Sequence, residues 1–383
     1  MENRSLIWLG NIAVTGQSVV NGASYFLPLY ITLQLHFSVL HVGTVLSMLG
    51  VGTLVGALSS SLICKVFSEY TTQIISFFGI AICLLAISFA DNLLLLNIAA
   101  FFWGVFLFLF RPANQVWMLS LVPAERRVQM TNVRRMILNA GVGVGFIING
   151  FLSHYNFKLV FYLLTAIALM LGSLMIYCFR YVGRVAHQQK VLSVKQSVPQ
   201  QASAVYLMYI SVFIVSVIYA QLRSNYPIYL HQVFYLDPRS FGLLFSLSTL
   251  LIVVLQIPII NWMSRYRQRT GIALGALFVG SGMVLMTLGN TIGYAIISVI
   301  IWTFGEILFF PLIQVAIFNA ATERTRVLYM GFYQFIFASG IVLGPIGGSL
   351  IYHYFSAMLL WWICGLLGFV AMLICFTLRK NDL

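Results

Sequence analysis

Three ionisable residues lie inside long apolar runs of the sequence, and their side chains offer anion binding and proton transfer. Arg111 follows the run FFWGVFLFLF, and Arg223 and Glu306 lie in two later runs. A guanidinium binds a carboxylate or a phosphate through parallel N–H donors. A carboxyl group takes up a proton when it is desolvated and releases it when a cation approaches. The residue types therefore predict a site for an anionic group beside a proton carrier.

A structural interpretation of the same residues stays open. In it, Glu306 forms an ion pair with an arginine from the other half of the chain, and the pair holds the bundle together or gates it. We favour the functional interpretation, because a charge in a bilayer costs about 2.5–3.5 kcal/mol on insertion scales and such residues usually face a cavity. One ion pair can also serve both purposes.

The composition places these residues in a membrane. Of the 383 residues, 61% are hydrophobic and 8% are charged, which is too little charge to cover a soluble protein. The apolar residues form long runs, unlike the alternating ten-residue segments of an outer-membrane barrel. We therefore predict an all-α polytopic membrane protein. The five cysteines occur singly, so the sequence predicts neither disulfides nor a metal site.

Twelve apolar runs are long enough to cross a bilayer, since a span takes about 20 residues. Their approximate limits are 6–33, 39–64, 72–90, 93–121, 136–154, 157–180, 204–232, 240–263, 271–289, 292–320, 327–354 and 357–378. Residues 181–203 form the only long polar segment. We interpret this segment as a cytoplasmic linker between two six-helix bundles, 1–180 and 204–383.

The basic residues orient these spans. With both termini in the cytoplasm, most of the 21 Lys and Arg residues fall on the cytoplasmic side, and Arg134 and Arg135 are among them. Only Lys158 and Arg239 then lie on the external side of the membrane. This bias follows the positive-inside rule, and it explains the net charge of +13 without a nucleic acid partner. We expect a multi-pass protein of the plasma membrane, in a bacterial inner membrane, with cytoplasmic termini.

The two bundles repeat one another. A shift of 199 residues pairs Trp103 with Trp302, Pro112 with Pro311, Gln115 with Gln314, Gly141 with Gly340 and Gly145 with Gly344. An even number of spans repeated in one orientation gives a parallel repeat, which is typical of transporters that rock two halves around a midplane site. Phe310 stands where Arg111 would recur, so this arginine is not part of the repeated scaffold.

The twelve spans, the linker and the repeat resemble the major facilitator superfamily over essentially the whole chain. The run GVGVGFIING at 141–150 is similar to the motif G-x-x-x-G-P-x-x-G-G of its drug/proton antiporters, and GIVLGPIGG at 340–348 is the counterpart. Small residues four apart let helices approach closely. We assign packing or gating to Gly141, Gly145, Gly340, Gly344 and Pro345.

Two departures from the family pattern bear on mechanism. After the second span, Ser60 replaces the Asp of the motif G-x-L-x-D-R-x-G-R-K/R. The resemblance implies that this Asp latches the outward-open state by charge pairing, so its replacement argues against such a latch. In the fourth span, Ala100 stands where drug/proton antiporters have an Arg, four residues before Gly104.

The resemblance also implies that spans one, four, seven and ten line a central cavity, and all three intramembrane charges fall in these spans. Glu306 is then the proton carrier. Substrate binding is assigned to Arg111, Arg223, Gln115, Asn21, Tyr25, Tyr226 and Gln314. Two arginines against one glutamate favour an organic anion or zwitterion, such as a metabolite or a siderophore.

We therefore expect a secondary active transporter that exports its substrate by alternating access with proton coupling, as a monomer and without a cofactor. Its partners are the small-molecule substrate, protons and the lipid bilayer. An uptake symporter or facilitator, a multidrug exporter and a transport-dead sensor are the alternatives. An enzyme is disfavoured, because no Ser/His/Asp set, HExxH, GxSxG or carboxylate pair occurs in or near the spans.

Overall fold

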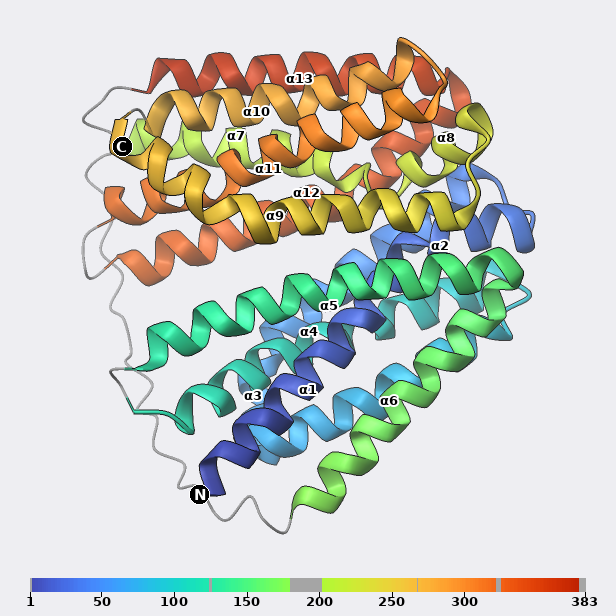
Figure 1. The fold of residues 1–383 in the computed structure, drawn as a ribbon, viewed down its shortest axis with the longest axis vertical. Helices are drawn as coiled ribbons and strands as arrows, with labels where there is room; N and C mark the ends of the chain where they lie inside the picture. Colours follow the sequence, from blue (N-terminus) through green and yellow to red (C-terminus); the bar gives the residue numbers. More distant parts are fainter. Residues whose placement is uncertain (1, 124–125, 180–201, 267, 322–324, 379–383) are drawn as a thin grey trace. The chain divides into compact units, whose positions relative to one another are not determined.

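The computed structural model describes residues 2–123, 126–179, 202–266, 268–321 and 325–378, and their regular structure is helical throughout (Figure 1). This confirms the predicted all-α fold. The predicted linker lies outside the described residues except for its last two, which begin helix α7 (Ala202–Ala220). The bundle boundaries at 180 and 204 stay a prediction.

The helices follow one another with short connections. Those before the predicted linker are α1 (Glu2–Gly22), η1 (Ala23–Tyr25), α2 (Leu27–Leu29), η2 (Tyr30–Gln34), α3 (Val39–Ser88), α4 (Leu93–Ser120), α5 (Arg127–Tyr155) and α6 (Phe157–Phe179). Those that follow α7 are α8 (Asn225–Phe234), α9 (Pro238–Tyr266), α10 (Gln268–Val284), η4 (Leu285–Thr287), α11 (Ile292–Ala320), α12 (Arg326–Tyr354) and α13 (Ala357–Thr377).

The number of spans differs from the twelve predicted. Nine helices of the described chain are long and apolar enough to cross a membrane, or ten if the bent pair α7 and α8 counts as one span. One reason is that α3 covers the predicted spans 39–64 and 72–90 together. Ser68 breaks α3 with φ 68° and ψ 159°, and its Oγ accepts the backbone N–H of Thr71 at 3.3 Å, as an N-cap does. The first predicted span is the other reason, because it is divided among α1, η1, α2 and η2.

The chain forms two compact units by contact. Unit 1 contains Met1–Ala186 and Leu236–Thr249, and unit 2 contains His187–Tyr235 and Leu250–Leu383. Helix α9 therefore contributes its first half to unit 1 and its second half to unit 2. In unit 1, α3 packs along α4 and α6, and α1 packs along α5. In unit 2, α10 packs along α11 and α13, and α7 packs along α12 and α13.

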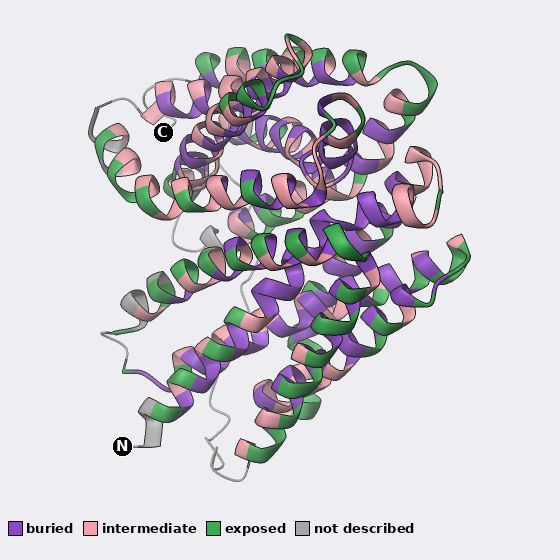
Figure 2. Ribbon diagram, turned by 45° about the vertical axis from the view of Figure 1, so that its right-hand side comes forward, coloured by how far each residue is buried: buried purple, intermediate pink, exposed green. Residues whose placement is uncertain are grey.

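Large apolar side chains cover the outer sides of many helices. Buried and exposed residues lie on opposite sides of the same helix (Figure 2). Leu58 is 73% exposed and Leu366 is 62% exposed, although both lie within apolar helices. Such extensive apolar exposure is unfavourable in water but favourable against lipid tails. The exposure pattern therefore agrees with the predicted membrane location.

The glycines assigned to packing lie at close helix contacts in both units. A Cβ added at Gly145 of α5 would lie 2.8 Å from the carbonyl oxygen of Val19 in α1. A Cβ at Gly344 of α12 would lie 3.0 Å from the carbonyl oxygen of Val217 in α7. The repeat of the sequence thus recurs as equivalent contacts within each unit. Any part of these residues in gating stays a prediction.

Replacing Gly145 with leucine should destabilise the protein, because the side chain meets the backbone of α1, which cannot move aside cheaply. Overpacking of this kind costs roughly 1–3 kcal/mol or more. Gly347→Leu is the matched control in the same kind of motif, since a Cβ at Gly347 meets no atom within 4 Å. The thermal unfolding midpoint in detergent should fall for Gly145→Leu alone. Equal midpoints for the two variants would contradict the packing assignment.

Candidate functional site

The seventh predicted span is broken where Arg223 lies. Helices α7 and α8 meet at an angle of 43°, and Arg223 is half-buried in the turn between them. The side-chain Nε2 of Gln221 in this turn donates to the carbonyl of Gly344 at 2.9 Å, and its Oε1 accepts from Asn225 at 2.7 Å. These bonds fix the turn against α12. Interrupted helices that present polar groups at membrane depth are a recurring feature of transporter sites.

The first predicted span is interrupted at the equivalent place of the repeat. Helix α1 ends at Gly22 and gives way to the 3-10 turn η1. The Ser24 hydroxyl, which corresponds to Arg223 in the repeat, donates to the carbonyl of Asn21 at 2.7 Å. The sequence analysis predicted uninterrupted spans here. Glycine and short polar residues weaken a helix at this point, and the interruption follows from them.

Tyr25 and Asn21 are buried at this interruption. The ring of Tyr25 contacts Phe146 of α5 with centroids 4.9 Å apart and Phe245 of α9 at 5.4 Å, all within unit 1. Asn21 is 8% exposed at the end of α1. Both predicted substrate residues therefore belong to a tightly packed layer.

Glu306 lies near the middle of α11 and is half-buried. The hydroxyl of Tyr219 on α7 donates to its Oε1 at 3.1 Å. The Tyr219 ring in turn packs edge-on against Phe310, with centroids 5.4 Å apart. Sequence reasoning did not include Tyr219, although it lies four residues before Arg223. In unit 2, α7 thus carries the phenol, α11 carries the carboxylate, and the turn after α7 carries Arg223.

Arg111 lies in α4 and is half-buried. Its guanidinium carbon stands 4.7 Å from the ring centroid of Phe108, which is a cation–π distance. Pro112 follows and has no N–H, so the carbonyl of Phe108 loses its usual helical donor. Gln115 lies one turn further along and is also half-buried. The Phe108 ring therefore supports one face of the planar guanidinium.

Arg134 was expected in a cytoplasmic loop and instead lies inside α5, 8% exposed. Its Nε donates to the Oδ1 of Asn114 at 3.1 Å, and its Nη2 donates to the carbonyl of Arg111 at 3.0 Å. Residue 134 precedes Gly141 by seven residues, so both lie on the face of α5 that packs on neighbouring helices. That spacing is the sequence signal that identifies Arg134, as opposed to the exposed Arg135.

Arg134 belongs to a network of buried side-chain amides within unit 1. The Nδ2 of Asn114 donates to the Oε1 of Gln73 in α3 at 3.0 Å, and it lies 3.5 Å from the carbonyl of Gly10 in α1. Asn114 and Gln73 are fully buried. The network links four helices through neutral groups and one guanidinium.

The remaining predicted substrate residues are Tyr226 and Gln314. Tyr226 is fully buried, with its hydroxyl 3.2 Å from that of Ser298 and its ring packed edge-on against Trp361. In this conformation Tyr226 belongs to the packed core of unit 2. Gln314 is half-buried on α11, two turns beyond Glu306. Substrate binding by either residue stays a prediction.

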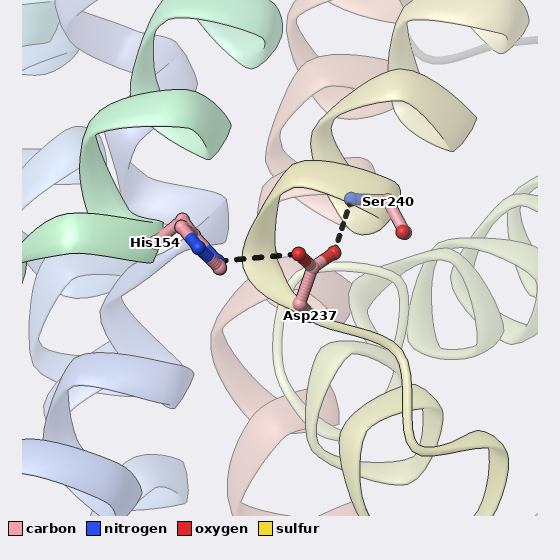
Figure 3. A network of polar contacts seen from close by, with 3 residues as sticks. All are labelled: His154, Asp237 and Ser240. Atoms are coloured by element: carbon pink, nitrogen blue, oxygen red, sulfur yellow. Dashed lines mark hydrogen bonds and ion pairs between the residues drawn. The ribbon is translucent and has the colours of Figure 1, made fainter.

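A polar contact that the sequence analysis did not predict joins α5 to the start of α9 within unit 1. The Nδ1 of His154 lies 3.2 Å from the Oδ2 of Asp237, whose Oδ1 accepts the backbone N–H of Ser240 at 2.9 Å (Figure 3). Burial raises the pKa of the Asp237 carboxyl, but hydrogen bonds from Ser240 and the charges of His154 and Arg239 outweigh it. The pKa therefore lies below its usual value of 3.8.

Asp237→Ala should destabilise the protein by about 1 kcal/mol, because the change removes the N-cap of α9. Asp237→Asn keeps an oxygen for Ser240 and loses only the charge, so its loss should be smaller. Since folding lowers the pKa of this carboxyl, its stabilising effect is present above the usual pKa and disappears as the pH falls through the lowered value. Thermal unfolding midpoints at pH 7 test the order of the variants, and equal losses would show that the cap contributes nothing.

The described residues include no group of three or more His, Cys, Asp or Glu side chains placed to hold a metal ion. The cysteines are free thiols, and Cys83, Cys364 and Cys375 are buried. The functional groups of the predicted site residues are guanidinium, carboxylate, amide and hydroxyl groups.

Comparison with known proteins places this geometry among transporters. The sequence model of the Major Facilitator Superfamily matches residues 7–316 and 208–382. The MFS-type transporter YqjV of Bacillus subtilis (strain 168) is 21% identical over 350 residues, which cover 90% of this chain and 85% of YqjV. The multidrug resistance protein MdtH of Salmonella arizonae is 22% identical over 278 residues, which cover 69% of this chain and 66% of MdtH.

A solved structure shares the fold at low sequence identity. A POT family transporter in complex with 5-aminolevulinic acid superposes with a TM-score of 0.83 at 15% identity, over 99% of this chain and 96% of that one. At this identity the likeness concerns the fold. It agrees with the architecture derived from the helices and their repeat.

Proposed function

The chain belongs to the Major Facilitator Superfamily, and from this premise we propose that it exports a small organic anion or zwitterion by alternating access in exchange for protons. Glu306 carries the proton. Arg111 and Arg223 bind the anionic part of the substrate. The membrane is the plasma membrane, with both termini in the cytoplasm.

The observation that carries the proposal is the position of Glu306. A carboxylate in the middle of a 29-residue apolar helix is retained at a cost, and such residues mark proton or substrate pathways. The Tyr219 hydroxyl on α7 donates to this carboxylate at 3.1 Å. Movement of α7 relative to α11 would remove that donor. The hydrogen-bond partners of Glu306 would then change with the conformation, and exchange requires such a link between the proton carrier and the conformation.

The arginines support an anionic substrate. Arg111 and Arg223 are both half-buried in apolar spans, and with Glu306 they give two positive charges against one negative charge. A guanidinium binds a carboxylate in a bidentate manner. The solved complex of a POT family transporter with 5-aminolevulinic acid shows that this fold accommodates a small carboxylic acid. Export is supported by the similarity of residues 141–150 to the antiporter motif.

Multidrug export is the second candidate, and the likeness to MdtH favours it. Against it stands Ala100, which replaces the arginine of the drug/proton antiporter pattern. A net positive site also disfavours lipophilic cations. The two candidates therefore predict opposite charge preferences in one assay.

Purified protein in liposomes tests the proposal. Radiolabelled benzoate, succinate, citrate and 5-aminolevulinate serve as acidic probes, and ethidium serves as the cationic probe. Exchange with protons requires that an acidic lumen drives uptake of at least one acid, whereas symport requires an acidic exterior. Transport of ethidium alone would support multidrug export instead. Absence of any gradient-driven flux would overturn proton coupling.

A further inference from the structure

We propose that Arg134 is a positioning residue for the anion site, which holds Arg111 in place and makes the site selective for negative charge. This inference rests on the proposed function and extends it to a residue outside the predicted site. It concerns unit 1 alone, where α4 and α5 carry the residues involved.

Arg134 holds α4 at two adjacent points. One hydrogen bond reaches the backbone carbonyl of Arg111 at 3.0 Å, and the other reaches the side chain of Asn114, three residues later, at 3.1 Å. Pro112 lies between these points and removes one backbone hydrogen bond from α4. The helix is therefore weakest where Arg111 must be oriented, and Arg134 supplies a donor from the neighbouring helix at that place.

The charge of Arg134 matters as well as its hydrogen bonds. Both acceptors that it contacts in the described chain, an amide oxygen and a peptide carbonyl, are neutral. A guanidinium that is 8% exposed has lost most of its hydration, and neutral acceptors do not compensate that loss fully. An anion bound at Arg111 would interact favourably with this second positive charge through a medium of low dielectric constant. A cation at the same place would be repelled.

The Asn114 contact allows the charge to be tested separately from the packing. Asn114→Asp keeps the shape of the side chain and the oxygen that Arg134 contacts, and it places a carboxylate 3.1 Å from Nε. It also removes the Nδ2 donor to Gln73, whose amide can turn to present its own N–H groups. The buried charge is then compensated while the contact remains. Arg134→Gln removes the positive charge and the planar set of guanidinium donors. Arg134→Lys keeps the positive charge but not that planar geometry. Arg135→Gln is the matched control, because Arg135 is the exposed neighbour on the same helix.

The experiment measures KM and the maximal rate of these four variants and of Arg111→Gln in liposomes, with benzoate, succinate, citrate and 5-aminolevulinate as probes. Arg134→Gln and Asn114→Asp should each raise KM for the acid that the wild type transports by about tenfold or more, in keeping with a lost charge-assisted interaction. Arg134→Lys should retain part of the affinity, and Arg135→Gln should equal the wild type. Thermal unfolding midpoints show whether each variant is folded.

The outcomes separate this inference from the proposed function. If Asn114→Asp leaves KM unchanged while Arg134→Gln only lowers the unfolding midpoint, Arg134 is a packing residue and the inference fails. If Arg111→Gln raises KM but neither Arg134→Gln nor Asn114→Asp does, the inference fails and the proposed function stands. If the wild type transports none of the four acids, both fail.

Discussion

Replacing Glu306 with glutamine is expected to abolish substrate accumulation driven by a pH gradient, while exchange of substrate across the membrane continues. Glutamine keeps the shape of the side chain and an oxygen that accepts the Tyr219 hydroxyl, but it neither takes up nor releases a proton. If Glu306 is the proton carrier, the conformational cycle remains possible and its link to the gradient is lost. The expected effect is a fall of driven uptake to the level of empty liposomes.

The measurement compares two assays on the same liposomes. Driven uptake of the transported acid is followed after a pH jump, and exchange is followed with labelled acid at equal pH on both sides. Asp91→Asn is the matched control, since Asp91 is an exposed carboxylate between α3 and α4. Loss of both activities in Glu306→Gln would point to the structural interpretation, in which the carboxylate holds helices together.

Tyr219→Phe separates the carboxylate from its hydrogen-bond donor. The variant removes the hydroxyl that stands 3.1 Å from Glu306 and keeps the ring that packs against Phe310. The hydroxyl links α7 to the carboxylate on α11, so its removal should lower driven uptake and leave exchange at equal pH unchanged. Driven uptake equal to that of the wild type would show that this hydrogen bond plays no part in coupling.

The sequence predicted well the features that follow from the spacing of residue types along the chain. Long apolar runs gave the helices, because a span must satisfy its backbone hydrogen bonds internally. The repeat and its small residues predicted that Gly145 and Gly344 lie at close helix contacts, since small residues four apart let two backbones meet. Both features depend on residues near one another in sequence or at a fixed repeat distance.

The features that sequence missed depend on tertiary surroundings. Arg134 and Arg135 are adjacent and identical in type, yet one is buried and the other exposed. The positive-inside rule counts both residues on the same side of the membrane and cannot distinguish them. The spacing of seven residues between Arg134 and Gly141, which places both on one helix face, does distinguish them. Tyr219 was missed because a tyrosine in an apolar run is ordinary until a carboxylate is known to lie beside it.

The helix breaks were missed for a related reason. Hydropathy averages over about 20 residues, so a turn at Gln221–Ser224 or at Ala23–Tyr25 does not interrupt the run. In the first of these turns, the side-chain amide of Gln221 donates to the carbonyl of Gly344 in α12. The break is stable only in the folded unit, and no local pattern reveals the partner.

Arg111 gives the second prediction of large effect: Arg111→Gln should abolish binding of the transported acid, and Arg111→Lys should restore only part of it. A guanidinium offers a planar fork that matches a carboxylate, whereas an ammonium offers a point charge. The loss of a charge-assisted pair of hydrogen bonds corresponds to about 1.5–3 kcal/mol for each bond, so the loss of both raises KM by about a hundredfold or more. The ring of Phe108 below the guanidinium should favour arginine further, because it supports a flat cation.

Repeat symmetry makes this test sharper, because the second bundle has Phe310 where Arg111 would recur. Arg111→Phe makes the two bundles alike at this position and should leave the helix packed but unable to bind the acid. Arg239→Gln is the control, as Arg239 is an arginine at the start of α9 that lies 5.2 Å from the ring of Tyr155. KM for the acid and the unfolding midpoint are measured for each variant. If Arg111→Phe transports the acid with the affinity of the wild type, Arg111 is not its ligand, and anion recognition must be assigned to other residues.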